Sequence, residues 1–363
     1  MALIVREAST ADLDSLWDLI GHANTGMTSL KIDQEQLADR IERSHFAFRR
    51  TQEHPEGAPY VFVMQDSDTG KLVGTSCIFS KTGGYEPFYA YRVVREIHTS
   101  ALLEQSREIR ALHLIKIHNG PTELGGLFLL PESRGCGGGR LLSLSRFLYI
   151  AAHLKRFANE TIAEMRGYQD ENGESPFWNA IGSHFFPIDF PRADALSMIN
   201  KQFIEDLMPQ YPIYLELLPE DAIAAIGKVH TQTQPALEML KRQGFVQKDL
   251  VDIFDAGAVV HCNTREIAAV RNARPCVLSR ILKAGTHRQY QERTPRHGDP
   301  KRQSLISTEN PRFQCTLGYC EGDGGHSESD GVIDNHERVA IDAETAEHLK
   351  AGLGDRLWVL SNW

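Results

Sequence analysis

A glycine-rich loop between an apolar run and an amphipathic segment constrains this chain more than any other feature. Residues 134–140 read Arg-Gly-Cys-Gly-Gly-Gly-Arg, after an apolar run at 123–130 that Pro131 ends. The next segment places apolar residues at helical spacing, at Leu141, Leu144, Leu148 and Ala151. This order predicts a strand, a glycine loop and a helix. Such a loop lets backbone N–H groups converge on a pyrophosphate at a helix N-terminus, although three glycines in a row also suit a flexible turn.

Two common phosphate-binding motifs do not match this loop. A P-loop requires Lys and then Ser or Thr after its last glycine, where this chain has Arg140 and Leu141. A dinucleotide-binding fingerprint would need a third glycine where Leu142 stands. The pattern Arg-x-x-Gly-x-Gly resembles instead the loop after the fourth strand of GNAT acyltransferases. The resemblance implies that acyl-CoA is bound by Arg134, Gly135, Gly137, Gly138 and Gly139.

Composition places the chain among soluble folded proteins. Its 363 residues suffice for two domains, and 41% hydrophobic with 24% charged residues is close to the globular average. The start of the chain does not resemble a signal peptide, and no apolar stretch approaches the ~20 residues that cross a bilayer. A net charge of −9 argues against nucleic-acid binding. Six cysteines without a Cys-x-x-Cys pair argue against zinc and disulfides. We therefore expect a cytoplasmic protein without metal, nucleic-acid or membrane partners.

Strand and helix patterns mix along the first 265 residues. The sequence predicts strands at 3–5, 60–64, 72–79, 88–94, 123–130, 161–165, 250–254 and 259–262. It predicts helices after an N-cap at Thr10, from Asp33 onward, and over 176–181, 196–207, 221–226 and 236–242. The last hundred residues have polar loops at 286–302 and 321–334, with strands at 313–319 and 357–360. We predict an α+β fold with one domain over 1–265 and a small β-rich domain over 266–363.

Beyond the glycine loop, segments along residues 1–265 resemble the arginine N-succinyltransferase family. They include Gly-Met-Thr-Ser-Leu at 26–30, Tyr-Val-Phe-Val at 60–63, Ala-Glu-Met-Arg-Gly at 163–167, Ser-Pro-Phe-Trp at 175–178, Val-His at 229–230 and Asp-Ile-Phe-Asp at 252–255. The resemblance implies a GNAT fold with a mainly helical insertion over about 168–230. It also implies succinyl transfer from succinyl-CoA, a co-substrate and not a tightly bound cofactor, to the α-amine of L-arginine in arginine catabolism.

The resemblance further implies roles for individual residues. Backbone amides of the fourth strand receive the acyl-CoA, at Leu127, Phe128 and Leu129. His230 corresponds to the family's acid/base histidine, whose ordinary pKa near neutrality suits proton transfer.

Candidate residues for the amine substrate come from its chemistry. A guanidinium calls for carboxylates. Carboxylates near the end of the predicted strand at 161–165 are Glu164, Asp170 and Glu171, although acidic residues in loops are commonly only solvated. Thr28 and Ser29 either bind the substrate carboxylate or cap the second helix.

Other functions stay open from the sequence alone. Met27 and Lys31 depart from the family's Gly-Leu-Thr-Ser-Leu-Pro loop, so a related acyltransferase for ornithine or another amine, or one using acetyl-CoA, also fits. A non-catalytic GNAT-like subunit that binds acyl-CoA or arginine is a third interpretation. The sequence favours neither a homo-oligomer nor a hetero-oligomer.

Overall fold

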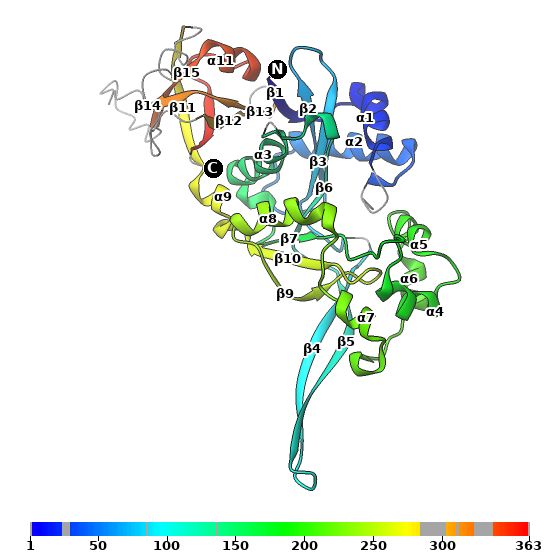
Figure 1. The fold of residues 1–363 in the computed structure, drawn as a ribbon. Helices are drawn as coiled ribbons and strands as arrows, with labels where there is room; N and C mark the ends of the chain where they lie inside the picture. The colour runs from blue at the N-terminus through cyan, green and yellow to red at the C-terminus, as the bar shows by residue number, and fades with distance from the viewer. Residues whose placement is uncertain are drawn as a thin grey trace.

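One continuous sheet runs through the protein (Figure 1). The computed structural model describes residues 2–23, 30–84, 86–135, 137–283, 303–309, 312–322 and 337–361. Within these residues the strand order is β14-β15-β11-β16-β12-β13-β1-β2-β3-β6-β7-β10-β9-β4-β5-β8. Helices cover the sheet, so the predicted α+β class is confirmed. No helix in the described ranges is long and apolar enough to cross a membrane.

The N-terminal part forms an antiparallel layer with helices on its faces. Its strands are β1 (Leu3–Glu7), β2 (Pro59–Asp66), β3 (Leu72–Phe79) and β6 (Thr122–Leu129). The helices are α1 (Leu13–Gly21), α2 (Gln34–Arg49) and α3 (Gly138–Ala152). In Figure 1, α1 and α2 lie on one side of these strands and α3 on the other. The predicted hairpin at 60–64 and 72–79 is confirmed.

The predicted helix starts are partly confirmed. Asp33 caps α2, because its side chain accepts a hydrogen bond from the Gln36 amide at 2.8 Å. Thr10 is not the N-cap of the first helix: a 3₁₀ turn begins there, and Ser9 precedes it. The carboxylate of Asp12 accepts from the Ser9 amide at 2.8 Å, which favours Ser9 as the cap.

The second half of the sheet begins at the strand that follows β6, and the two strands at this junction separate. Its strands are β7 (Glu160–Glu164), β9 (Val246–Val251) and β10 (Ala258–Asn263), and α8 (Gln234–Arg242) precedes β9. The parallel register of β6 with β7 joins Thr122 to Thr161 and Glu123 to Ile162 and ends there. The two strands therefore separate toward their C-terminal ends.

A long hairpin extends from the body, at the bottom of Figure 1. β4 (Phe88–Ser100) and β5 (Gln105–Ile117) pair along their whole length. The register joins β4 to β9 at Tyr91 and Arg92, and β5 to β8 (Ile213–Tyr214) at Ala111 and Leu112. The sequence predicted a strand only at 88–94, so it missed β5 and the outer part of β4.

Short helices between β7 and α8 pack against the base of this hairpin. They are α4 (Ser183–Phe185), α5 (Phe190–Ser197), α6 (Gln202–Leu207) and α7 (Glu220–Ala225). A second core joins Tyr91 of the hairpin to Phe177 and Trp178. The single helix predicted over 196–207 is wrong, because the Asn200 side chain accepts from the Gln202 amide at 2.6 Å and starts a new helix.

The C-terminal strands continue the main sheet. They are β11 (Arg274–Leu282), β12 (Ser304–Thr308), β13 (Gln314–Gly318), β14 (Cys320–Gly322), β15 (Glu337–Asp342) and β16 (Arg356–Leu360). α9 (Ala268–Asn272) leads into them, and α11 (Ala343–Leu349) packs on them. The strands predicted at 313–319 and 357–360 are confirmed. The loops predicted at 286–302 and 321–334 lie almost wholly outside the described residues. Because β13 pairs with β1, the division at residue 265 remains a prediction.

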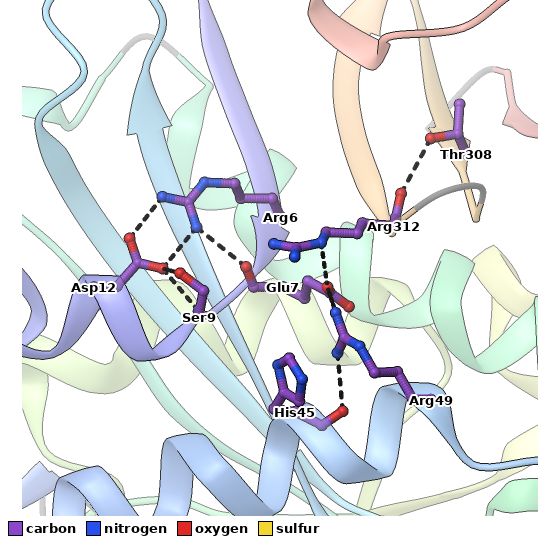
Figure 2. Close-up of polar contacts among 8 residues, drawn as sticks. All are labelled: Arg6, Glu7, Ser9, Asp12, His45, Arg49, Thr308 and Arg312. Atoms are coloured by element: carbon purple, nitrogen blue, oxygen red, sulfur yellow. Dashed lines mark hydrogen bonds and ion pairs between the residues drawn. The ribbon is translucent and has the colours of Figure 1, made fainter.

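Ion pairs secure the C-terminal part at the end of β1 (Figure 2). The buried Glu7 carboxylate lies 2.9 Å from Arg49 of α2 and 3.5 Å from Arg312, which precedes β13. Arg6 donates to both oxygens of Asp12, at 2.8 and 2.7 Å. We call Arg6, Glu7, Asp12, Arg49 and Arg312 the β1 ion-pair cluster. Each of its charges has an opposite charge beside it.

Candidate functional site

A cavity of about 1050 Å³ lies where β6 and β7 separate. Its lining comes from both strands, from α3 and α8, from the end of β3, and from the helices after β7. The glycines that follow β3, Gly83 and Gly84, line it, and so do Ala236 and Leu240 of α8. The cavity therefore reaches between the two halves of the sheet.

A bulge in β6 lines this cavity. Thr75 of β3 pairs with Phe128, and Cys77 pairs with Gly125, so two residues of β6 stand opposite one of β3. The two residues opposite Ser76 are Gly126 and Leu127, and both line the cavity. Gly126 has φ +59°, a left-handed conformation that favours glycine. The bulge thus turns a backbone segment out of the regular ladder beside the cavity.

The glycine loop is positioned by the end of β6. Arg134 donates from Nε to the Leu129 carbonyl at 3.1 Å, which fixes the turn after the strand. Gly135 and Gly137 both have φ +86°, and Gly137 is the N-cap of α3. Gly138 and Gly139 open the helix, where the first amides have no intrahelical partner.

The start of α3 is electropositive. Partial burial and the nearby Arg242 lower the pKa of Arg140, yet an arginine stays charged at neutral pH. Two cations therefore stand near the amides that begin the helix, and together they favour an anion there. Cys136 lies outside the described residues.

Carboxylates form one wall of the cavity. Glu164, at the end of β7, has a side chain that is exposed to solvent. The protein around this side chain nevertheless raises the pKa of its carboxyl well above the ordinary value, and the carboxylates of Glu123 and Asp252 raise it further. Burial likewise raises the pKa of Glu123, opposed by Lys201 and then Arg40. We call Glu123 and Glu164 the acidic wall. An added cation would stabilise both carboxylates.

His230 is held at the end of β7. Its amide donates to the Arg166 carbonyl at 2.9 Å, and Thr233, which lines the cavity, donates from Oγ1 to the His230 carbonyl at 3.0 Å. Nδ1 accepts the Gln232 amide at 3.1 Å, so the neutral ring carries its proton on Nε2. Burial and the Arg166 guanidinium lower the pKa of His230. The ring is therefore neutral at neutral pH, and His230 is not itself among the residues that line the cavity, although Arg166 and Thr233, which contact it, are.

Close backbone packing at Gly167 and Gly257 sets the position of His230. Gly167 donates to the buried Asp255 carboxylate at 2.6 Å, and Gly257 donates to its other oxygen at 2.8 Å. A Cβ on Gly257 would lie 2.0 Å from the Met165 carbonyl oxygen, and one on Gly167 would lie 2.3 Å from that of Asp255. Only glycine fits at either point, and the bridge from Gly167 to Val229 then places His230.

The structure does not bring every candidate residue to the cavity. The Asp170 carboxylate accepts the amides of Asn172 and Glu174, at 2.8 and 2.9 Å, and so closes its own turn. Neither Asp170 nor Glu171 is among the residues that line the cavity. Thr28 and Ser29 lie outside the described residues. Leu127 lines the cavity, while Phe128 and Leu129 are buried beside it.

Several cavity residues were missed from the sequence. They are Glu123, Arg146, Arg166, Asp194, Lys201, Asp252 and Asp255. Arg146 did carry a signal, because it is the one charged residue between Leu141 and Ala151 of an apolar helix. Glu123 likewise stands at the start of an apolar strand. Lys201 and Asp194 carried none, since they reach the cavity only through the folding of the insertion.

Comparisons with known proteins agree with one another. A family model described as the arginine N-succinyltransferase beta subunit matches residues 3–269. Arginine N-succinyltransferase subunit beta of Pseudomonas aeruginosa is 43% identical over 278 residues, which cover 76% of this chain and 81% of that protein. Arginine N-succinyltransferase of Yersinia pseudotuberculosis is 42% identical over 270 residues, 74% of this chain and 77% of the other.

A solved structure extends the likeness to the whole chain. Arginine/ornithine succinyltransferase subunit AI of Pseudomonas aeruginosa has a TM-score of 0.81 and 30% identity. The match covers 99% of this chain and 98% of that one, so the C-terminal strands are part of the shared fold.

Proposed function

The chain belongs to the arginine N-succinyltransferase family, and we propose that it transfers a succinyl group from succinyl-CoA to the α-amine of L-arginine in the cytoplasm. The observation that carries this proposal is the cavity between β6 and β7. It combines an acidic wall, which suits a guanidinium, with a strand bulge, which suits a thioester carbonyl.

The separation of β6 and β7 supports acyl-CoA binding between them. The register gives no β7 partner to the residues of β6 after Glu123, so that edge can receive a ligand. We assign the Leu127 amide to the thioester oxygen, with Phe128 and Leu129 continuing the same strand. The pyrophosphate would lie at the start of α3, against Arg134, Gly135, Gly137, Gly138 and Gly139.

Transfer then proceeds directly between the substrates. The neutral amine attacks the thioester carbon, a C–N bond forms, the C–S bond breaks, and CoA leaves as a thiolate that takes up a proton. The Leu127 N–H donates to the carbonyl oxygen as negative charge develops on it. Burial raises the pKa of Cys77 to about 12, so this thiol beside the bulge stays protonated and is not a nucleophile.

His230 suits the proton transfer that completes the reaction. Nε2 is the ring atom left for the substrates, because Nδ1 holds the Gln232 amide. Nε2–H donates its proton to the leaving thiolate while the proton lost by the amine reaches Nε2 through water, so the ring ends as it began. The lowered pKa keeps the ring in this neutral form at neutral pH.

The acidic wall supports recognition of the guanidinium by Glu164 and Glu123. Because the pKa of Glu164 is raised, cation binding releases a proton from it. L-Arginine should therefore bind more tightly as the pH rises through the pKa of Glu164. The positions of Asp170 and Glu171 do not support them as ligands. Thr28 and Ser29 remain candidates for the carboxylate of the amine substrate.

The proposal is tested by initial rates of CoA release with a panel of substrates. The acyl donors are succinyl-CoA, butyryl-CoA and acetyl-CoA, and the amines are L-arginine, L-ornithine and agmatine. We expect the highest kcat/KM for succinyl-CoA with L-arginine. Faster turnover of acetyl-CoA or of ornithine would replace the substrate assignment, and no turnover with any pair would favour a non-catalytic subunit.

The names of two relatives bear on assembly. The Pseudomonas aeruginosa proteins are named as subunits, and we infer that this chain also works in an oligomer. Light scattering on the active protein measures its mass. Full activity at the monomer mass of 40.7 kDa would contradict this inference.

A further inference from the structure

Arg146 of α3 is a buried cation at the cavity. Its side chain is only 2% exposed, and it is one of the residues that line the cavity. Its hydrogen bonds go to Ser143, one turn earlier in the same helix: Nε donates to the carbonyl at 3.3 Å and Nη2 to Oγ at 3.1 Å. No hydrogen bond of the described residues uses Nη1. Two neutral oxygens therefore hold the guanidinium in place without neutralising it.

The cation has no counter-ion in the described part of the chain. Burial lowers the pKa of Arg146 to about 10, so the group is still charged at neutral pH. The titratable neighbour that acts on it is the Cys77 thiol, and no carboxylate does. A buried charge without a partner is strongly unfavourable, so a fold retains one at a cavity where a ligand supplies the opposite charge.

Two other cations that line the cavity, unlike Arg146, have carboxylates near them. Arg166 lies near Asp194 and Asp255, which favour its charged form, and Lys201 acts on Glu123 and Glu164. The acidic wall therefore has cations of its own, while Arg146 stands apart from it. The cavity contains one region that suits a cation and another that suits an anion.

Arg146 stands at the level of the β6 bulge. Cys77, its electrostatic neighbour, pairs with Gly125, and a Cβ on Gly126 would lie 3.6 Å from the Cys77 Cβ. Leu127, to which the thioester oxygen is assigned, is the next residue. A four-carbon acyl group held at Leu127 is short, so its far end stays in this part of the cavity.

We propose that Arg146 binds the distal carboxylate of the succinyl group and so selects succinyl-CoA over uncharged acyl-CoAs. The inference rests on the proposed function, because it takes the thioester to lie at the bulge. A carboxylate reaching Nη1 would convert an unpaired buried cation into a charge-assisted pair. The amine substrate also carries a carboxylate, and the test separates the two.

The decisive comparison uses succinyl-CoA and butyryl-CoA, which have four-carbon acyl groups that end in a carboxylate or a methyl. For Arg146→Met we expect kcat/KM for succinyl-CoA to fall about 10- to 100-fold, the usual worth of a hydrogen bond to a charged group. Butyryl-CoA should be used as well as by the wild type, or better. Arg146→Lys, which keeps the charge, should retain part of the preference for succinyl-CoA.

Arg6→Met is the matched control, since it removes a paired arginine that does not line the cavity. It should leave the ratio of succinyl-CoA to butyryl-CoA unchanged. The melting temperature of Arg146→Met should not fall below that of the wild type, because the variant removes an unpaired charge. An unchanged acyl ratio in stable Arg146→Met overturns the inference. A loss that falls on KM for L-arginine, and vanishes with agmatine, also overturns it and assigns Arg146 to the amine substrate.

Failure of the proposed function would look different. If the wild type does not turn over succinyl-CoA, calorimetry with succinyl-CoA and butyryl-CoA decides the role of Arg146. Tighter binding of succinyl-CoA by the wild type, lost in Arg146→Met, supports the inference. Equal affinities overturn it.

Discussion

The cavity between β6 and β7 and the β1 ion-pair cluster treat buried charge in opposite ways. In the cluster, Glu7 lies between two arginines, and Arg6 binds both oxygens of Asp12 (Figure 2). In the cavity, Glu123 raises the proton affinity of Glu164, and Arg146 has no described counter-ion. The same chain therefore pairs charges where they hold two segments together and leaves one cavity cation, Arg146, without a counter-ion among the described residues.

This difference separates stability from activity. A paired buried charge is costly to break, because its partner is left alone, whereas removal of an unpaired one relieves a desolvation penalty. Substitutions in the cluster should therefore lower the free energy of unfolding and spare turnover. Substitutions in the cavity should do the reverse.

The largest effect is expected at His230, beside the cavity. His230→Ala should lower kcat by about 10²- to 10⁴-fold, the usual worth of acid–base catalysis, because the ring that donates a proton to the leaving thiolate is lost. Calorimetry with CoA should show unchanged affinity. His230→Gln cannot titrate in this range, so it should flatten the pH–rate limb that the histidine controls. Wild-type kcat in either variant would make His230 a structural residue.

A smaller effect is expected on the acidic wall. Glu164→Gln should raise KM for L-arginine about 10- to 100-fold, because a carboxylate that pairs with the guanidinium is lost. KM for succinyl-CoA should stay within about twofold, as expected of a site that only the amine touches. Glu171→Gln is the matched control, since Glu171 lies outside the cavity, and it should behave as wild type. Equal changes in both variants would remove Glu164 from the substrate site.

A substitution in the β1 ion-pair cluster should change the free energy of unfolding and leave turnover unchanged. Glu7→Gln leaves Arg49 and Arg312 without their shared carboxylate, and the free energy of unfolding should fall by about 2 kcal/mol. This value is less than for a fully buried pair, because the arginine side chains are 38% and 55% exposed. Urea denaturation measures it. A change in KM for either substrate would show that the cluster and the cavity are coupled after all.

The smallest effect concerns His153, at the end of α3, whose Nε2 lies 3.7 Å from Glu309. Burial, with Arg156 adding to it, lowers the pKa of His153 to about 4, while an unfolded histidine titrates near 6.5. The unfolded state therefore takes up a proton first as the pH falls below 6.5. Wild-type stability should drop by about 1 kcal/mol more than that of His153→Gln between pH 7 and 5.5. Parallel urea midpoints for the two proteins over this range would refute the buried, neutral histidine.

Local patterns predicted much of the fold. The glycine loop and its flanking strand and helix were evident because glycine, proline and helical spacing act within a few residues. The hairpin of β4 and β5 was not, because its strands beyond the base have no core to impose an alternation of polar and apolar residues. The pattern over 196–207 likewise predicts a single helix. In the structure α5 ends at Ser197, and the Asn200 side chain accepts the Gln202 amide where α6 begins.

The resemblance to the arginine N-succinyltransferase family is confirmed by the comparisons. The candidate site was predicted in part. Glu164 and Leu127 line the cavity, and His230 is hydrogen-bonded to Arg166, which also lines it, but Asp170 closes its own turn. From the sequence, Asp170 and Glu164 were equivalent carboxylates near one strand end. Only the direction of each side chain in the fold separates them.

What the sequence by itself determined is the set of local structures and the family. Capping residues, glycines and periodic apolar positions act on their neighbours, so they can be interpreted without a fold. What only the tertiary structure decided is which charges meet. Glu123, Arg146 and Lys201 lie on three separate elements, and the separation of β6 from β7 brings them to one cavity. The energy of a charge depends on its burial and its neighbours, and both are set by packing between distant segments.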